Sequence, residues 1–318
     1  MGQTQVIMDQ IFYLGLIVLI GFLVMKTKYI KETVSNGLSA YLVRISVPCL
    51  VISTFASMDF TAEKLKSGAL VLIISYAIIG LLLGAGKAVA KLLHFSKVGE
   101  IAHTYLSACG NVIFLGYPIV SALFGKEGLY YAMLYALAND SVVWSLSVFS
   151  LLRVNNKKEN VLRKLFNPNT VSLLIGIVIM ITGFRFPDVI QRALEGIGGT
   201  TTPVSMLFIG MTLATIKLSE FSNLWKAFFA VLMKMLLMPV ILMYLFSALQ
   251  GWIAIPAMGL VVIILEAAMP CQSIYAALAK EYGGDVSYAT QCILVTTVCS
   301  FFTLPFIYFL IERMGTLV

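Results

Sequence analysis

The sequence predicts an all-α, polytopic membrane protein with about ten transmembrane helices. Of its 318 residues, 60% are hydrophobic and only 12% are charged, whereas a soluble domain carries about 25% charged residues. Apolar runs long enough to cross a bilayer recur from one end of the chain to the other. The net charge of +7 comes from short basic tracts between these runs, a pattern that sets membrane topology. The composition therefore indicates the lipid bilayer, and not a nucleic acid, as the partner.

Ten apolar runs are predicted to be spans. They cover residues 7–25, 37–56, 68–90, 101–124, 128–152, 169–184, 189–215, 225–249, 256–279 and 285–311. The seventh differs from the others, because it begins amphipathically and becomes fully apolar only after Pro203.

The distribution of lysine and arginine orients these spans. With the N-terminus outside, the cytoplasmic segments hold 14 of the 22 basic residues and the outer segments hold 6, while Arg44 and Lys234 lie inside spans. Basic loops stay on the cytoplasmic side, so we expect both termini outside, in a multi-pass protein of the cell membrane. The basic, polar segment 153–168 is then a cytoplasmic linker.

This linker divides the chain into two parts, 1–152 and 169–318, with five predicted spans each. An odd number of spans gives the two parts opposite orientations, which is the arrangement of an inverted repeat. The second span of each part contains a proline, at Pro48 and Pro203.

The fourth span of each part is interrupted, at Gly110–Pro118 and at Met269–Gln272. Paired interruptions in corresponding spans indicate the binding site of a secondary transporter. A break inside the bilayer is tolerable only against protein or a water-filled cavity, because each unpaired backbone group costs several kcal/mol. Proline is favoured at the first helical position, so we expect each C-terminal half-helix to begin at or just after Pro118 or Pro270.

Two half-helix N-termini that converge make an anion site without a permanent cation, since each carries roughly half a positive charge and unpaired N–H groups. The amides of Asn111 and Gln272 lie beside the breaks and could orient a carboxylate. Their alternative role is hydrogen bonding between helices. The substrate-binding candidates are Gly110, Asn111, Gly116, Pro118, Pro270, Cys271 and Gln272.

Four ionisable side chains lie deep inside predicted spans: Arg44, Asp140, Lys234 and Glu266. An unpaired charge at the membrane centre costs at least ~2.5–3.5 kcal/mol, so each needs a partner or a function. Asp140, preceded by Asn139, is the candidate for coupling to a proton or cation, with a structural pair to Lys234 or Arg44 as the alternative. Glu266 is a candidate for the substrate site, for ion coupling or for a structural charge pair. Lys234 fits a structural role, and Arg44 fits either a structural role or a countercharge to the anion.

Two motifs resemble the signatures of the auxin efflux carrier family, which includes the plant PIN carriers and many bacterial permeases. The run Asn111-Val-Ile-Phe-Leu-Gly116-Tyr-Pro118 is similar to N-x4-G-x-P, and Ala268-Met-Pro270-Cys-Gln272 followed by Ala279-Lys280-Glu281-Tyr282 is similar to A-L/M-P and A-K-E-Y. The long cytoplasmic loop of the plant carriers is absent, which favours a compact permease of prokaryotic type.

The resemblance implies two five-helix inverted repeats whose broken fourth and ninth helices cross at mid-membrane. It also implies a scaffold of helices one, two, six and seven, often a homodimer. Helices three to five and eight to ten would form a transport domain with an elevator-like cycle. The implied substrates are small organic anions, either mono- or dicarboxylates or auxin-like weak acids. The coupling ion, H⁺ or Na⁺ or neither, stays open.

A ligand-binding receptor or sensor and a channel are the alternatives to a carrier. An enzyme is disfavoured, because the sequence contains no H-E-x-x-H, no G-x-S-x-G and no phosphate-binding loop. The five cysteines lie in apolar runs without metal-ligand spacing. We therefore predict no catalytic residue, no metal and no cofactor.

Overall fold

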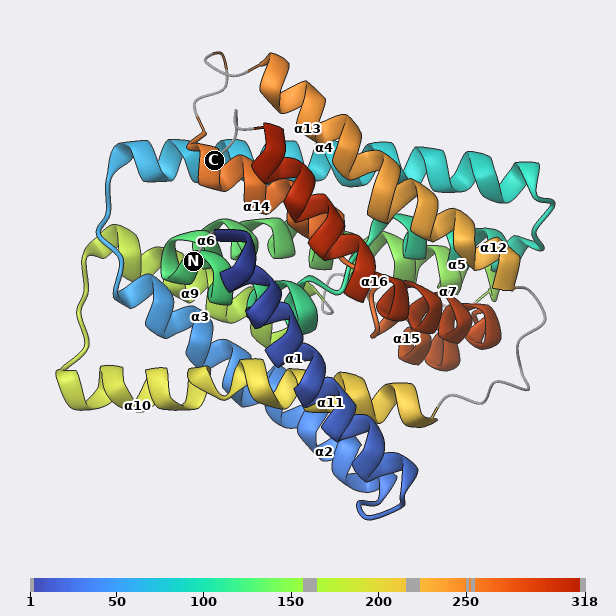
Figure 1. Cartoon of the computed structure of the whole chain (residues 1–318), viewed down its shortest axis with the longest axis horizontal. Helices are drawn as coiled ribbons and strands as arrows, with labels where there is room; N and C mark the ends of the chain where they lie inside the picture. The colour runs from blue at the N-terminus through green and yellow to red at the C-terminus, as the bar shows by residue number, and fades with distance from the viewer. Residues whose placement is uncertain (1–2, 157–164, 216–223, 250–251, 253–254, 315–318) are drawn as a thin grey trace. The chain divides into compact units, whose positions relative to one another are not determined.

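Apart from one isolated bridge, the regular segments that the computed structural model describes are all helical (Figure 1). The structure describes residues 3–156, 165–215, 224–249, 252 and 255–314, so the middle of the predicted linker 153–168 lies outside the described residues. Among the described residues, six helical stretches are long and apolar enough to cross a membrane, and shorter apolar helices accompany them. The predicted all-α polytopic class is confirmed, while the count of ten spans stays a prediction.

Helices (α) alternate with short π-helical segments (η) along the chain. The first half of the chain forms α1 (Gln3–Lys26), α2 (Glu32–Tyr41), η1 (Leu42–Ser46), α3 (Val47–Ala56), α4 (Ala62–Leu92), α5 (Lys97–Ala108), η2 (Val112–Gly116), α6 (Tyr117–Val142), η3 (Val143–Ser147) and α7 (Val148–Val154). The second half forms α9 (Pro168–Thr182), α10 (Asp188–Gly199), α11 (Thr201–Thr215), α12 (Leu224–Ala230), η5 (Val231–Leu237), α13 (Met238–Ala248), α14 (Ala257–Ala267), α15 (Tyr275–Tyr282) and α16 (Val286–Met314). Within α6 the helical course is interrupted at Gly125, whose φ of 59° lies in the region that glycine tolerates.

Three π-helical segments, η1, η2 and η5, each end two residues before a proline, at Pro48, Pro118 and Pro239. Proline has no N–H, and its ring clashes with the carbonyl four residues back. The helix widens there, so that the Val47 N–H donates to the Leu42 carbonyl and the Met238 N–H donates to the Met233 carbonyl, five residues back. The wider turn carries the helix past a proline without breaking it.

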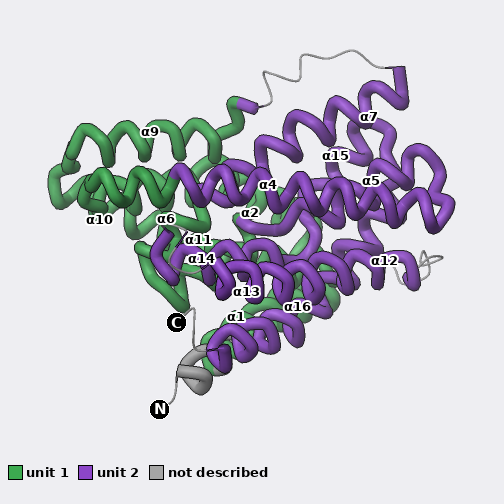
Figure 2. Tube along the Cα trace, turned by 90° about the horizontal axis from the view of Figure 1, so that it is seen from above, with its two compact units in different colours: residues 1–68, 113–133, 166–216 green, residues 69–112, 134–165, 217–318 purple. Residues whose placement is uncertain are grey.

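The chain folds into two compact units, and each unit takes residues from both halves of the sequence (Figure 2). Unit 1 comprises residues 1–68, 113–133 and 166–216, and unit 2 comprises residues 69–112, 134–165 and 217–318. Unit 1 thus contains the predicted first, second, sixth and seventh spans, together with part of the fourth and fifth. The assignment of a scaffold and a transport domain stays a prediction.

In unit 1, helix α1 packs along α11 (Figure 1) at a distance that only glycine permits. A Cβ added at Gly210 would lie 2.0 Å from the Val18 carbonyl oxygen, and one added at Gly21 would lie 2.3 Å from the Leu207 carbonyl oxygen. Close approach of backbones through small residues is how helices gain van der Waals contact inside a membrane, where the hydrophobic effect between helices is absent.

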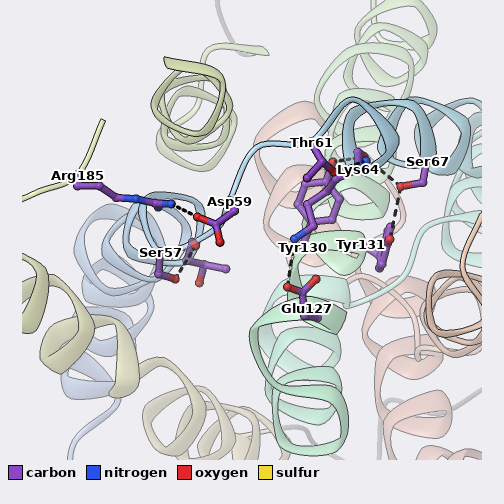
Figure 3. Close-up of polar contacts among 10 residues, drawn as sticks. Ser57, Asp59, Thr61, Lys64, Ser67, Glu127, Tyr130, Tyr131 and Arg185 are labelled. Carbon is purple, nitrogen blue, oxygen red and sulfur yellow. Dashed lines mark hydrogen bonds and ion pairs between the residues drawn. The ribbon is translucent and has the colours of Figure 1, made fainter. Parts of the chain in front are cut away.

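Polar contacts join the ends of the helices in unit 1 (Figure 3). The Lys64 ammonium at the start of α4 contacts the Glu127 carboxylate at 3.1 Å, and the Tyr130 hydroxyl donates to the Lys64 carbonyl at 3.0 Å. The Arg185 guanidinium, between α9 and α10, contacts the Asp59 carboxylate at 2.5 Å. Exposed ion pairs contribute about 0–1 kcal/mol, so these contacts position the helix ends more than they stabilise the unit.

In unit 2, α16 packs against α12, η5 and α13, and α15 packs against α16 and α7. Helix α5 also packs against α16 and α7, so α5 and α15 share these two neighbours. Residues 134–142 of α6 belong to this unit and carry Asn139 and Asp140.

Gly210→Ala should lower the thermal stability of the protein in detergent, because the new methyl group meets the Val18 carbonyl oxygen and forces α1 away from α11. Gly196→Ala on α10 is the matched control, since no heavy atom lies within 4 Å of a Cβ built there. It should leave the unfolding temperature unchanged or raise it, because Gly in a helix is roughly 0.5–1 kcal/mol less favourable than Ala. Equal unfolding temperatures for the two variants would contradict the close packing.

Candidate functional site

The two interrupted spans contain short non-helical segments in unit 2. Helix α5 ends at Ala108 and the chain becomes helical again at Val112, while α14 ends at Ala267 and α15 begins at Tyr275. The first break is thus Cys109–Asn111, and the second is the longer segment 268–274.

The backbones of the two breaks are bonded to each other in an antiparallel bridge between Gly110 and Cys271. The Asn111 N–H donates to the Pro270 carbonyl at 2.8 Å, and the Gln272 N–H donates to the Cys109 carbonyl at 3.2 Å. We call the residues 109–111 and 270–272 the junction. Its two hydrogen bonds satisfy main-chain groups that the helix breaks would otherwise leave unpaired.

Two side chains complete the pairing of the junction's backbone. The amide of Asn139 on α6 accepts from the Gly110 N–H at 2.9 Å and donates to the Gly110 carbonyl at 3.2 Å, as a neighbouring strand would. The Thr296 hydroxyl on α16 accepts from the Cys271 N–H at 3.0 Å. Asn139, expected beside a coupling residue, therefore also holds the first break in place. Thr296 was not predicted, because a threonine in an apolar helix carries no distinguishing local pattern.

The prediction that each C-terminal half-helix begins at or just after its proline is wrong. Pro118 lies inside a helical course that starts six residues earlier, and it widens that course into η2 instead of starting it. Pro270 lies within the second break, five residues before α15. Pro118 thus lies outside the first break, whereas Pro270 lies within the second, where its carbonyl accepts from the Asn111 N–H.

One carboxylate, that of Asp140 on α6, lies beside the junction. The Asn139 Nδ2 and the Gln272 Nε2 atoms each lie 3.4 Å from the Asp140 Oδ1 atom. Asp140 is 3% exposed, and it has further interactions within the described chain. The Gln272 Oε1 atom is buried and has no hydrogen-bond partner among the described residues.

Two further ionisable side chains are buried in unit 2, namely Lys234 on η5 and Glu266 on α14, with 1% and 0% of their surface exposed. Neither the Lys234 Nζ nor either Glu266 carboxylate oxygen hydrogen-bonds to a described residue. Lys234 and Glu266 lie close enough to interact electrostatically. No hydrogen bond joins Lys234 and Glu266 among the described residues, and the roles predicted for the two residues stay predictions.

The remaining predicted residues divide between the units. Cys271 is part of the junction, and its thiol contacts the Leu106 carbonyl oxygen at 3.1 Å. Gly116 and Pro118 fall in unit 1, as does Arg44, which is on the exposed side of η1. Unit 2 therefore brings together Gly110, Asn111, Asn139, Asp140, Lys234, Glu266, Pro270, Cys271 and Gln272.

Comparison with known proteins identifies the family. The family model described as "Membrane transport protein" matches residues 6–308, so the chain belongs to this family of membrane transporters. It is the auxin efflux carrier-like family that the two motifs indicated, and that resemblance is confirmed. The chain is thus a multi-pass membrane transport protein.

Two archaeal proteins are similar to almost the whole chain. One, an "Uncharacterized transporter" of Methanothermobacter thermautotrophicus, is 24% identical over 311 residues, which cover 96% of this chain and 97% of the relative. The other, the "Uncharacterized transporter MJ1031" of Methanocaldococcus jannaschii, is 24% identical over 301 residues, covering 92% of this chain and 95% of the relative.

Asn139→Ala should destabilise the protein, because it leaves both the N–H and the carbonyl of Gly110 without their partner. Each buried backbone group left unpaired costs about 1–3 kcal/mol, so the unfolding temperature in detergent should fall by several degrees. Asn36→Ala, at an exposed position of α2, is the matched control and should change it little. An unfolding temperature for Asn139→Ala as high as that of the control would show that Asn139 does not hold the break.

Proposed function

We propose that this membrane transport protein is a secondary carrier of small organic anions, namely mono- or dicarboxylates or auxin-like weak acids, and that its substrate site is the junction. The observation that carries the proposal is the bonding of two interrupted helices, backbone to backbone, at Gly110 and Cys271. A transporter keeps non-helical backbone at membrane depth where it lines a binding site.

The chemistry of the junction favours an anion. The helical courses that follow the two breaks begin beside it, at Val112 and Tyr275, and a helix N-terminus carries roughly half a positive charge. The junction's backbone groups are already paired to each other, to Asn139 and to Thr296. The side-chain amides of Asn111 and Gln272 are therefore the groups that we assign to the carboxylate.

The carrier cycle that we propose is elevator-like, with unit 2 as the moving part and unit 1 as the scaffold. The support for this division is that the junction and the three buried side chains Asp140, Lys234 and Glu266 belong to one unit. Such a unit would carry substrate and coupling groups together. The proposal includes a homodimer in the cell membrane, with both termini outside and the linker 153–168 in the cytoplasm.

Flux measurements in proteoliposomes test the carrier. We expect saturable uptake, and counterflow from preloaded vesicles, for at least one of acetate, pyruvate, malonate, malate and indole-3-acetate. A channel would give flux that neither saturates nor shows counterflow, and a receptor would give binding without flux. Either result, or no flux of any of the five, would refute the carrier.

Asn111→Ala and Gln272→Ala should each weaken binding of the transported carboxylate, by roughly tenfold for a lost hydrogen bond to a charged group. Ligand-induced thermal stabilisation measures this binding, and the variants should unfold cooperatively without ligand. Unchanged affinity in both variants would exclude the junction as the site.

Asp140→Asn should abolish the dependence of uptake on a pH or Na⁺ gradient while carboxylate binding persists, because it removes the titratable group beside the junction and retains its shape. Uptake with and without each gradient provides the measurement. Asp59→Asn in unit 1, where the carboxylate is 91% exposed and pairs with Arg185, is the matched control and should retain the dependence. The coupling role of Asp140 would be refuted if uptake by Asp140→Asn still depended on a gradient, or if uptake by the wild type depended on neither gradient.

A further inference from the structure

Lys234 lies at the centre of η5, the π-helical segment that Pro239 causes. Compared with a regular α-helix, a π-helical turn changes the angle between the side chains before it and those after it. The Lys234 side chain is 1% exposed and does not reach solvent. Snorkelling, which a lysine inside a span commonly achieves, is therefore not its role.

The ammonium of Lys234 reaches the junction at Gly110. A Cβ placed on Gly110 would lie 3.2 Å from the Lys234 Nζ, so the ammonium lies close to the side of Gly110 on which any other residue would carry its side chain. The same Cβ would lie 3.2 Å from the Met269 Cβ and 3.4 Å from the Glu266 carbonyl oxygen. The Nζ atom is thus held beside the backbone bridge of the two broken helices.

This ammonium has three donors and no hydrogen-bond partner among the described residues. Burying a charge without a hydrogen-bond partner is costly, and no described residue supplies an acceptor to this ammonium. Glu266 is close enough to interact electrostatically, yet neither of its oxygens hydrogen-bonds to the ammonium. The backbone carbonyls of the junction are already occupied: those of Cys109, Gly110 and Pro270 accept from Gln272, Asn139 and Asn111.

We propose that Lys234 supplies a fixed positive charge to which the carboxylate of the transported anion binds at the junction. The anion provides the acceptors that the ammonium lacks. The site then takes an anionic carboxylate and rejects a neutral amide of the same shape. This assignment rests on the proposed function. It adds a permanent cation to the site, whereas the sequence analysis predicted an anion site made by helix N-termini alone.

The test is carboxylate binding by Lys234→Gln, measured as thermal stabilisation of the purified protein by acetate, pyruvate, malonate, malate and indole-3-acetate. For each acid that stabilises the wild type, we expect Lys234→Gln to bind roughly ten- to a hundredfold more weakly, as for loss of a charge-assisted hydrogen bond. Lys234→Arg should retain part of the affinity. Lys226→Gln is the matched control: its ammonium lies 4.3 Å from the centre of the Phe95 ring, and its loss should leave affinity unchanged.

The double variant Lys234→Gln/Glu266→Gln guards against misfolding, because it removes one buried charge of each sign. It should fold and still bind the carboxylate weakly, and wild-type affinity in either glutamine variant would overturn the role of Lys234. The wild type supplies a test that needs no variant: acetamide, malonamide and indole-3-acetamide should not stabilise it, and equal stabilisation by acid and amide would also overturn the proposal. If no acid binds or is transported by the wild type, the proposed function itself fails, which is distinct from binding that is insensitive to Lys234.

Discussion

Unpaired main-chain groups cannot remain in a bilayer, and this constraint shapes unit 2. Both interrupted helices expose N–H and carbonyl groups at their breaks, and the protein pairs these groups with each other across Gly110 and Cys271. Because the pairing needs the two segments to meet, it fixes α5 and α14 at one point. Asn139 and Thr296 pair the main-chain groups that the bridge leaves over, so α6 and α16 are tied to the same point.

The two units differ in what holds them together. In unit 1, glycines bring backbones into contact, as at Gly210, and exposed ion pairs position the helix ends. Among the described residues, the buried carboxylate and lysine side chains, Asp140, Lys234 and Glu266, all belong to unit 2. Charged groups inside a membrane protein are costly and are associated with transport pathways, so the uneven distribution supports the proposal that the substrate site lies in unit 2.

The helical class, the family and the two interrupted spans could be predicted from sequence, because hydropathy and the motifs around Asn111 and Pro270 are local signals. The second break, at 268–274, contains the predicted interruption Met269–Gln272. The extent of the first break could not be predicted, because proline lowers helix stability without deciding where pairing ends the helix. Pro118 produces a π turn, and the break falls at Cys109–Asn111. The surroundings of Lys234 could not be predicted from the sequence either. The residue lies in the π-helical segment η5, and it approaches Gly110, which is far away in the chain.

Main-chain atoms join the two breaks, which leaves the side chains of Asn111 and Gln272 free to differ. The N–H groups of Asn111 and Gln272 donate whatever side chains those residues carry, and only proline at either position would remove a donor. Substitutions at these two positions can therefore change the side chains beside the bridge while its hydrogen bonds persist. A single architecture can in this way give rise to carriers of chemically different solutes.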